Sequence, residues 1–334
     1  MPTAKLKFED LIPVEVDQLR PAGAYGKMKA TRAEHTQVYW GDDQRVRSEL
    51  VEEIPCPLCG GGDHAELFEK EGFRFVECRE CGLVFVNPQL REEVYEDVYK
   101  DQSYSDIIKN LVASSNDYRK QRFGTERLDI VEQFTGVRGG KLLDIGCTTG
   151  FILEEAERRG WDAHGIEANP YAAEVARDKG LKVENVIVEQ ASFPLEEFDA
   201  VTAFDVIEHV RAPLPILEKA RDLLKPGGML FLYVPNWDSA SRLIMGSEAH
   251  FIWGTHHMTY FTVDTLQQVL DRAGFEVVHH ETQGLDIEDI IWWCSNEAGH
   301  DTAFLEAYRN QLQFLCNAGD WGKNLRMYAR RPIR

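Results

Sequence analysis

From Lys141 onward the chain alternates short apolar runs with longer amphipathic segments, and this alternation constrains the fold more than any other feature. The apolar runs predict buried strands, and the segments between them have the apolar spacing of helices. Strands that alternate with helices build a parallel sheet covered on both faces. The sequence therefore predicts an α/β domain over residues 137–334, doubly wound around a mostly parallel, seven-stranded Rossmann-like sheet.

The expected elements follow one another in regular order. The helices are expected at 147–160, 169–180, 213–224 and 262–274, with the turn LKPGG ahead of the fifth strand. The strands are KLLDIG (141–146), WDAHGIEA (161–168), VENVIVE (183–189), FDAVTAFDVIEHV (198–210), MLFLYVPN (229–236), FEVVHHE (275–281) and NLRMYARR (324–331).

Four of the seven cysteines form two CxxC pairs, Cys56 with Cys59 and Cys78 with Cys81. A two-residue gap lets a tight turn direct both thiolates at one ion, and a glycine follows each pair. The segments FRFVEC and LVFV alternate like strands, which predicts a hairpin between the two knuckles. Four thiolates leave no open coordination position, so we expect a structural zinc ion and not a catalytic one.

The other segments complete the domain organisation. We expect an N-terminal arm over residues 1–53, the zinc-ribbon module over 54–90, and a helical linker or lid over 91–136. An insertion is expected at about 236–262.

Five motifs follow one another along the chain: LLDIGCTTG, HGIEANP, FDAVTAFDVIEHV, LKPGG and VPN. This series resembles the class I S-adenosylmethionine-dependent methyltransferases. The segment that carries the resemblance covers roughly residues 141–278. The upstream CxxC and CRECGLVFVNP resemble the zinc-ribbon leader of a bacterial subgroup that acts on sugars and other small metabolites. The resemblance implies a methyltransferase fold, S-adenosylmethionine as the cofactor and a small-molecule acceptor, and it implies that the insertion at about 236–262 helps to bind this acceptor.

Candidate cofactor-binding residues lie at the carboxyl ends of the first strands, where open α/β sheets bind ligands. Glu167 is placed to accept hydrogen bonds from both ribose hydroxyls, and the resemblance implies that Asp144 helps to hold the methionine end. Glu189, or a nearby amide, is expected to face the adenine. The complete set is Asp144, Gly146, Cys147, Thr148, Gly150, Glu167, Ala168, Glu189, Phe204 and Asp205.

The glycine loop departs from the family pattern, because Thr148 stands where the middle glycine is usual. A threonine costs little there if its backbone angles are ordinary. The alternative of a nicotinamide-binding fold needs GxGxxG, and the loop Gly-Cys-Thr-Thr-Gly does not supply it.

Methyl transfer needs an aligned nucleophile and usually a base. One candidate cluster is Asp205, Glu208 and His209, which the spacing would place on one helical face. An equivalent set can hold a divalent cation in the ubiquinone-pathway O-methyltransferases that this segment resembles; a buried structural pair is the alternative. A second cluster lies in HFIWGTHHMTYFT, where His256 and His257 are candidates for the base, with His256 placed ahead.

The composition limits the partners. Lys and Arg total 37 against 56 Asp and Glu, a formal charge of −19 that disfavours nucleic acid. No apolar run reaches the length of a membrane span, and the N-terminal stretch does not resemble a secretory signal, so we expect a cytoplasmic protein. The oligomeric state stays open.

The predicted activity is O-methylation of a sugar or natural product. The alternatives are a zinc-ribbon RNA methyltransferase, a sugar C-methyltransferase and an inactive scaffold that binds only the cofactor. The C-methyltransferases carry a long further C-terminal domain that this sequence does not show, and His279 and His280 receive no predicted role.

Overall fold

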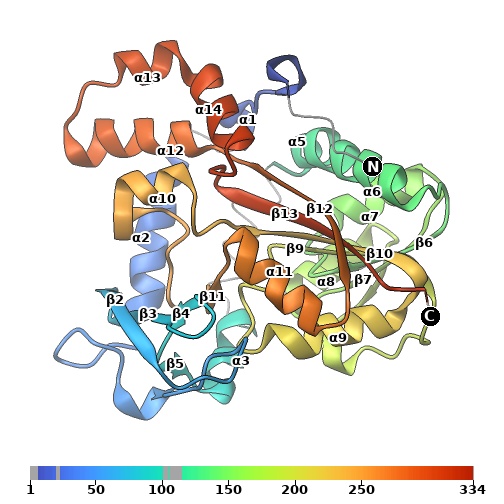
Figure 1. Cartoon of the computed structure of the whole chain (residues 1–334), viewed down its shortest axis with the longest axis horizontal. Helices are drawn as coiled ribbons and strands as arrows, with labels where there is room; N and C mark the ends of the chain where they lie inside the picture. The colour runs from blue at the N-terminus through green and yellow to red at the C-terminus, as the bar shows by residue number, and fades with distance from the viewer. Residues whose placement is uncertain (1–6, 20–22, 101–104, 106–114, 334) are drawn as a thin grey trace.

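A computed structural model describes residues 7–19, 23–100, 105 and 115–333 (Figure 1). Within these ranges the central sheet has seven strands, as expected. Five neighbouring strands are parallel, and β13 pairs antiparallel with both β10 and β12. In spatial order the strands are β12 (Glu276–Gln283), β13 (Asn324–Arg330), β10 (Leu224–Pro235), β9 (Phe198–Phe204), β6 (Lys141–Ile145), β7 (Asp162–Ile166) and β8 (Lys182–Glu184).

Both faces of this sheet are buried. Successive side chains of a strand point to opposite faces, so Leu230 and Leu232 join one core cluster while Met229 and Phe231 join another. The first cluster lies under α9 (Pro213–Leu223) and α11 (Val263–Arg272). The second lies under α6 (Thr125–Thr135), α7 (Phe151–Arg158) and α8 (Pro170–Asp178).

Local chemistry starts these helices where the sequence suggests. The side chain of Asn169 accepts a hydrogen bond from the amide of Ala172 and caps α8, which has Pro170 in its first turn. Thr262 and Thr265 form a reciprocal capping box at the start of α11.

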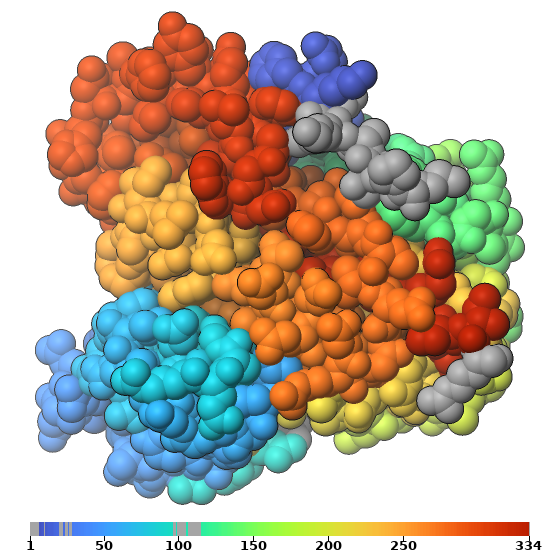
Figure 2. Space-filling model, viewed as in Figure 1, coloured from blue at the N-terminus to red at the C-terminus, as the bar shows by residue number. Residues whose placement is uncertain are grey.

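A second sheet contains the cysteine segment. Its order is β11 (Thr259–Tyr260), β4 (Val84–Val86), β3 (Phe73–Cys78) and β2 (His64–Lys70), all antiparallel. A pair of short strands, β1 (Val51–Glu52) and β5 (Gln89–Leu90), lies beside it. Figure 2 shows the cysteine segment, in blue and cyan, next to the orange part of the α/β domain that supplies β11.

The remaining elements connect and cover these sheets. Before the central sheet lie η1 (Phe8–Asp10), α1 (Val16–Leu19), α2 (Ala24–Gln37), η2 (Ser48–Leu50), α3 (Glu92–Lys100), α5 (Asn116–Arg119) and the π-turn η5 (Lys120–Gly124). Within and after it lie η6 (Val188–Gln190), α10 (Ala240–Met245), η7 (Gly246–Glu248), α12 (Asp286–Trp293), the π-turn η8 (Cys294–Ala298), α13 (Ala303–Ala307) and α14 (Arg309–Ala318).

Two expectations about elements were wrong. The third strand ends at Glu184, and residues 188–190 form the short helix η6 instead. The fourth strand ends at Phe204, where the sequence placed its end, but Asp205 adopts a left-handed conformation with φ of 56° and the next residues form turns instead of a helix. Asp205, Glu208 and His209 therefore do not share a helical face. Part of the expected lid, residues 101–104 and 106–114, lies outside the described residues.

Every helix within the described ranges is too short or too polar to serve as a membrane span.

Candidate active site and candidate metal centre

The loop after β6 turns sharply at the carboxyl edge of the sheet. Gly146 has φ of 72°, and any side chain there would come within 2.6 Å of Val206. Gly150, with φ of 85°, begins α7, where a side chain would meet Leu181 at 2.3 Å. Both positions therefore need glycine, and the loop backbone lies open to a ligand.

Thr148, in the same loop, has φ of 48°. The low cost expected for a threonine here required ordinary backbone angles, and this condition is not met. A left-handed conformation costs a residue with a side chain about 1–2 kcal/mol. Strain of this kind gathers at ligand sites, where the surrounding structure holds it in place.

Asp144, the last residue but one of β6, is a buried carboxyl group. Thr202 Oγ1 donates a hydrogen bond of 2.6 Å to its Oδ1. Burial raises the pKa of Asp144 to about 7, although the Thr202 hydrogen bond and the charge of Arg127 oppose the shift. A positively charged ligand group beside it would favour the ionised form.

Glu167 follows β7 and ties two loops together. Its Oε2 accepts from the Thr148 amide at 2.9 Å and its Oε1 from the Asn169 amide at 2.7 Å. Each carboxylate oxygen retains a second lone pair for a ligand hydroxyl. The adjacent Ala168 is half-buried, and its carbonyl accepts from Asn185.

A cavity of about 910 Å³ opens at this edge of the sheet. Its walls include the N-terminal arm, α6, the loop after β6, the ends of β9 and β10, and α14. Of the predicted cofactor residues, those that line it are Asp144, Gly146, Cys147, Thr148, Phe204 and Asp205. Gly150, Glu167, Ala168 and Glu189 do not line it, and Glu189 is exposed on η6.

Sequence reasoning missed Arg127, which lines the same cavity from α6. Only 9% of it is exposed, and its guanidinium carbon lies 4.4 Å from the Phe204 ring and 4.8 Å from the Tyr233 ring. Among the described residues no carboxylate pairs with it, and its buried Nε has no hydrogen-bond partner. An arginine beside Leu128 on the apolar stripe of an amphipathic helix was the available sequence clue.

The three candidate histidines have different environments. His256 is only 2% exposed, stacks on Trp253 at 3.7 Å and does not line the cavity. His209 lines the cavity, and its ring centroid lies 4.6 Å from that of His257. His209 thus reaches the cavity directly and His257 adjoins it through His209, whereas the sequence placed His256 first.

Backbone carbonyls orient both of these rings. His209 Nδ1 lies 2.9 Å from the His256 carbonyl oxygen, and His257 Nδ1 lies 2.7 Å from that of Phe251. A carbonyl only accepts, so each Nδ1 carries the proton and each Nε2 carries the lone pair. Burial lowers the pKa of His209 to about 4, so this ring is neutral at physiological pH.

Glu208 lies next to His209 and His257. It is 1% exposed, and among the described residues neither carboxylate oxygen has a hydrogen-bond partner. Its Oε1 lies 3.7 Å from His209 Nε2, and ligand atoms of Glu208, His209 and His257 all lie within 4.8 Å of one another. Such a group could hold a divalent cation; without one, burial raises the pKa of Glu208 well above its usual range. His257 thus takes the place that the sequence gave to Asp205.

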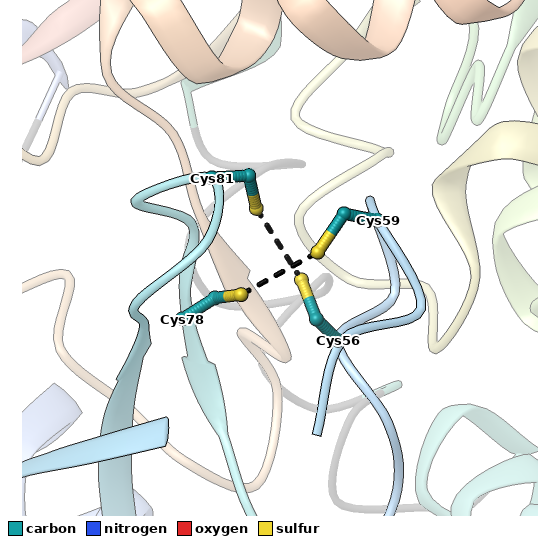
Figure 3. A group of neighbouring side chains, drawn as sticks. All are labelled: Cys56, Cys59, Cys78 and Cys81. Carbon is teal, nitrogen blue, oxygen red and sulfur yellow. Dashed lines mark hydrogen bonds between the residues drawn. The ribbon is translucent and has the colours of Figure 1, made fainter. Parts of the chain in front are cut away.

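The four paired cysteines converge from two loops, as Figure 3 shows. The Sγ atoms of Cys56 and Cys81 lie 3.5 Å apart, and those of Cys59 and Cys78 lie 3.4 Å apart. Four sulfurs at the 2.3 Å distance typical of zinc lie about 3.8 Å apart in a tetrahedron. The chemistry and the spacing of these four residues therefore fit a zinc ion.

His279 and His280, which received no predicted role, also line the cavity from β12. The His279 ring lies 5.3 Å from the Phe134 ring of α6 in a stacked arrangement. The antiparallel pairing of β12 with β13 brings this strand beside the site, and strand periodicity alone did not indicate that position.

Comparison with known proteins identifies the domain. Residues 118–280 match the family described as a methyltransferase domain. A ubiquinone biosynthesis O-methyltransferase of Cereibacter sphaeroides is 35% identical over 167 residues, which cover 46% of this chain and 67% of that protein. An enzyme of the same name from Ruegeria pomeroyi is 34% identical over 202 residues, 57% of this chain and 76% of that one.

A solved structure supports the fold alone. One chain of a complex from Haloferax volcanii, between a methyltransferase activator and a proposed methyltransferase, superposes with a TM-score of 0.52 at 16% identity. The match covers 71% of this chain and 98% of that one.

Proposed function

The chain belongs to the S-adenosylmethionine-dependent methyltransferases, which act here on a small molecule, and we propose that its acceptor is a hydroxyl group of a sugar or a similarly polyhydroxylated natural product. The observation that carries this proposal is the polar wall of the cavity. Six carboxamide side chains line it: Gln133, Gln283, Asn310, Gln313, Asn317 and Asn324.

A carboxamide both donates and accepts hydrogen bonds, so it matches the mixed donor and acceptor character of a hydroxyl group. A wall of such side chains suits an acceptor that carries several hydroxyls. A long hydrocarbon tail would offer these side chains no hydrogen bonds.

A second candidate is an aromatic hydroxyl. The relatives named ubiquinone biosynthesis O-methyltransferases are 34–35% identical to this chain over the shared region. Aromatic rings of Phe123, Phe134 and Tyr233 also line the cavity and offer a flat, apolar surface. The carboxamide wall favours the polyhydroxylated acceptor over this alternative.

The charged side chains that line the cavity indicate how the cofactor would bind. S-adenosylmethionine supplies an electrophilic methyl group on a positively charged sulfur. We propose that Arg127 binds the carboxylate at its methionine end and that Asp144 faces the ammonium group. Glu167 would accept from the ribose hydroxyls, beside the loop amides that it already holds.

His209 is the proposed general base, with His257 beside it. A neutral imidazole whose Nε2 carries the lone pair can accept the hydroxyl proton as the acceptor oxygen attacks. The acceptor oxygen forms the new bond to the methyl carbon, and its proton passes to His209.

The cysteine site would hold structural zinc. All seven cysteines are free thiols, and a reducing, cytoplasmic compartment would keep them so.

The test compares two acceptor classes with labelled S-adenosylmethionine. Nucleotide sugars are expected to gain the label, and dihydroxybenzoates are expected to gain little or none. Transfer to the phenols alone would overturn the proposed acceptor and leave the enzyme class intact.

A matched pair of variants on α14 locates the acceptor. Asn310 lines the cavity, whereas its exposed neighbour Gln311 does not. Asn310→Leu should raise KM for the sugar acceptor about 2–13-fold, the loss of one hydrogen bond. The affinity for S-adenosylhomocysteine should stay unchanged, and Gln311→Leu should alter neither quantity. Equal effects of the two substitutions would remove α14 from the acceptor site.

A further inference from the structure

The sheet that contains the four-cysteine hairpin does not end with that hairpin. Its edge strand β11 comes from the insertion in the methyltransferase domain, about 170 residues later in the chain. Thr259 pairs with Phe85 and Tyr260 with Val84. The Val86 amide then donates to the Met258 carbonyl at 3.0 Å. Strand β4 starts three residues after Cys81, so the second knuckle leads directly into this pairing.

From β11 the contacts continue to the proposed base. The amides of Met258 and Thr259 both donate to the Glu208 carbonyl, at 2.7 and 3.2 Å. The carbonyl of His256 accepts a hydrogen bond from the Nδ1–H group of His209. His257 lies between these two contacts in the chain. The backbone next to β11 thus orients the His209 ring, and His257 belongs to that same backbone, with its ring oriented by the Phe251 carbonyl.

Side chains reinforce the connection. Phe73, Phe75 and Val84 of the hairpin belong to the same buried cluster as Met258 and Tyr260. The rings of Phe75 and Tyr260 lie 5.6 Å apart. The Tyr260 hydroxyl accepts from the Trp253 amide at 3.1 Å, which holds the loop that leads into the histidines.

We propose that the four-cysteine hairpin, with its metal bound, is a positioning device for His209 and His257. A hairpin of this size has too little core to hold its own register, and a bound metal supplies that stability. Loss of the metal releases the knuckle at Cys78 and Cys81, then β4, and then the backbone that orients His209 and carries His257. The catalytic consequence rests on the proposed base, but the structural connection does not.

The test follows histidine tautomers by NMR in the full-length protein labelled with ¹⁵N-histidine. With metal bound, His209 and His257 should both carry the proton on Nδ1. After removal of the metal with a thiophilic chelator, both should lose this fixed tautomer, and zinc or cobalt(II) should restore it. His164, which contacts Asp162 on β7 outside this unit, should keep its resonances throughout.

Titration with S-adenosylhomocysteine serves as the check on folding. Its affinity should change less than about twofold on metal removal, because the cofactor seat belongs to the central sheet. Unchanged tautomers in metal-free protein would overturn the proposal. Loss of cofactor binding together with the tautomers would also overturn it, because the module would then be a general stabiliser.

Cys78→Ser provides an independent route to the metal-poor state and should shift the same two histidines. In the methyl-transfer assay, metal removal should lower kcat and leave the cofactor Kd unchanged. If the tautomers respond but no acceptor of either class is methylated, the positioning proposal stands and the proposed acceptor fails.

Discussion

Three residues at the carboxyl edge of the sheet have surroundings that lower the stability of the fold. Asp144 is a buried carboxyl group, Arg127 is a buried guanidinium without an ion-pair partner among the described residues, and Thr148 is left-handed. Each arrangement costs free energy that a zwitterionic ligand would offset for the two charged groups. These residues are therefore better explained by binding than by stability.

The raised pKa of Asp144 makes a pH-dependent prediction. Its folded-state value of about 7 lies above the ordinary value of 3.8, so the folded protein binds the extra proton between them. Folding stability therefore falls as pH rises through this window. Asp144→Asn removes this loss, so its stability relative to the wild type should improve by roughly 2–4 kcal/mol between about pH 5 and about pH 8.

Urea unfolding without cofactor measures this difference. Asp178→Asn, at the exposed end of α8, is the surface control and should show no such trend. Parallel stability curves for Asp144→Asn and the wild type would show that this carboxyl group is not protonated in the folded protein.

At the scale of elements, the N-terminal arm forms a wall of the cavity. Figure 1 shows α1 beside α14 and α5. The Glu15 amide donates to the Tyr118 hydroxyl at 2.8 Å, Arg122 donates to the Ile12 carbonyl at 2.9 Å, and Phe8 packs edge-on against Phe314. The apolar residues that the arm directs at the cavity are Leu11, Ile12, Pro13, Val14, Val16 and Leu19.

Deletion of residues 1–19 should leave the fold intact, because so few contacts hold the arm. The cavity would lose a wall, so the dissociation rate of S-adenosylhomocysteine should rise about tenfold, equivalent to about 1.4 kcal/mol. Stopped-flow displacement measures this rate. Phe8→Ala, which removes only the ring contact with Phe314, should produce a smaller increase. Identical rates for the deletion and the full chain would mean that the arm does not cover the cofactor.

At the scale of the whole molecule, the predicted domains pack as one body. The hairpin, the insertion and α12 share a single buried cluster, which includes Phe75, Tyr260 and Ile290. Segments 54–90 and 236–262, which the sequence suggested as separate units, thus depend on each other. The chain as a whole carries a formal charge of −19.

This charge predicts weak contact with nucleic acid. Total RNA should not be retained by the immobilised protein even at low ionic strength, because the phosphate backbone is repelled. A pull-down over a series of salt concentrations checks this. Retention that falls steeply with added salt would instead support the RNA methyltransferase alternative.

The fold of the central domain could be predicted from the sequence because its strands are buried on both faces. Continuous apolar runs such as LLDI and MLFLYV have few other ways to bury their side chains. The glycine loop and the cysteine pairs were also readable, since each depends on neighbours within a few positions. The end of the third strand could not be predicted, because VENVIVE is apolar enough for a strand throughout. In the structure the strand stops at Glu184, and the last residues of this segment enter η6.

The candidate site divides in the same way. Local sequence alone determined the glycine loop with Gly146 and Gly150, the acidic Glu167 after the next strand, and the four-cysteine cluster. Only the tertiary structure decided that His257 joins Glu208 and His209 and that His256 turns away. The same is true of Arg127 in the cavity. These residues meet through strand pairing and packing between segments far apart in the chain, and no spacing along the sequence encodes such contacts.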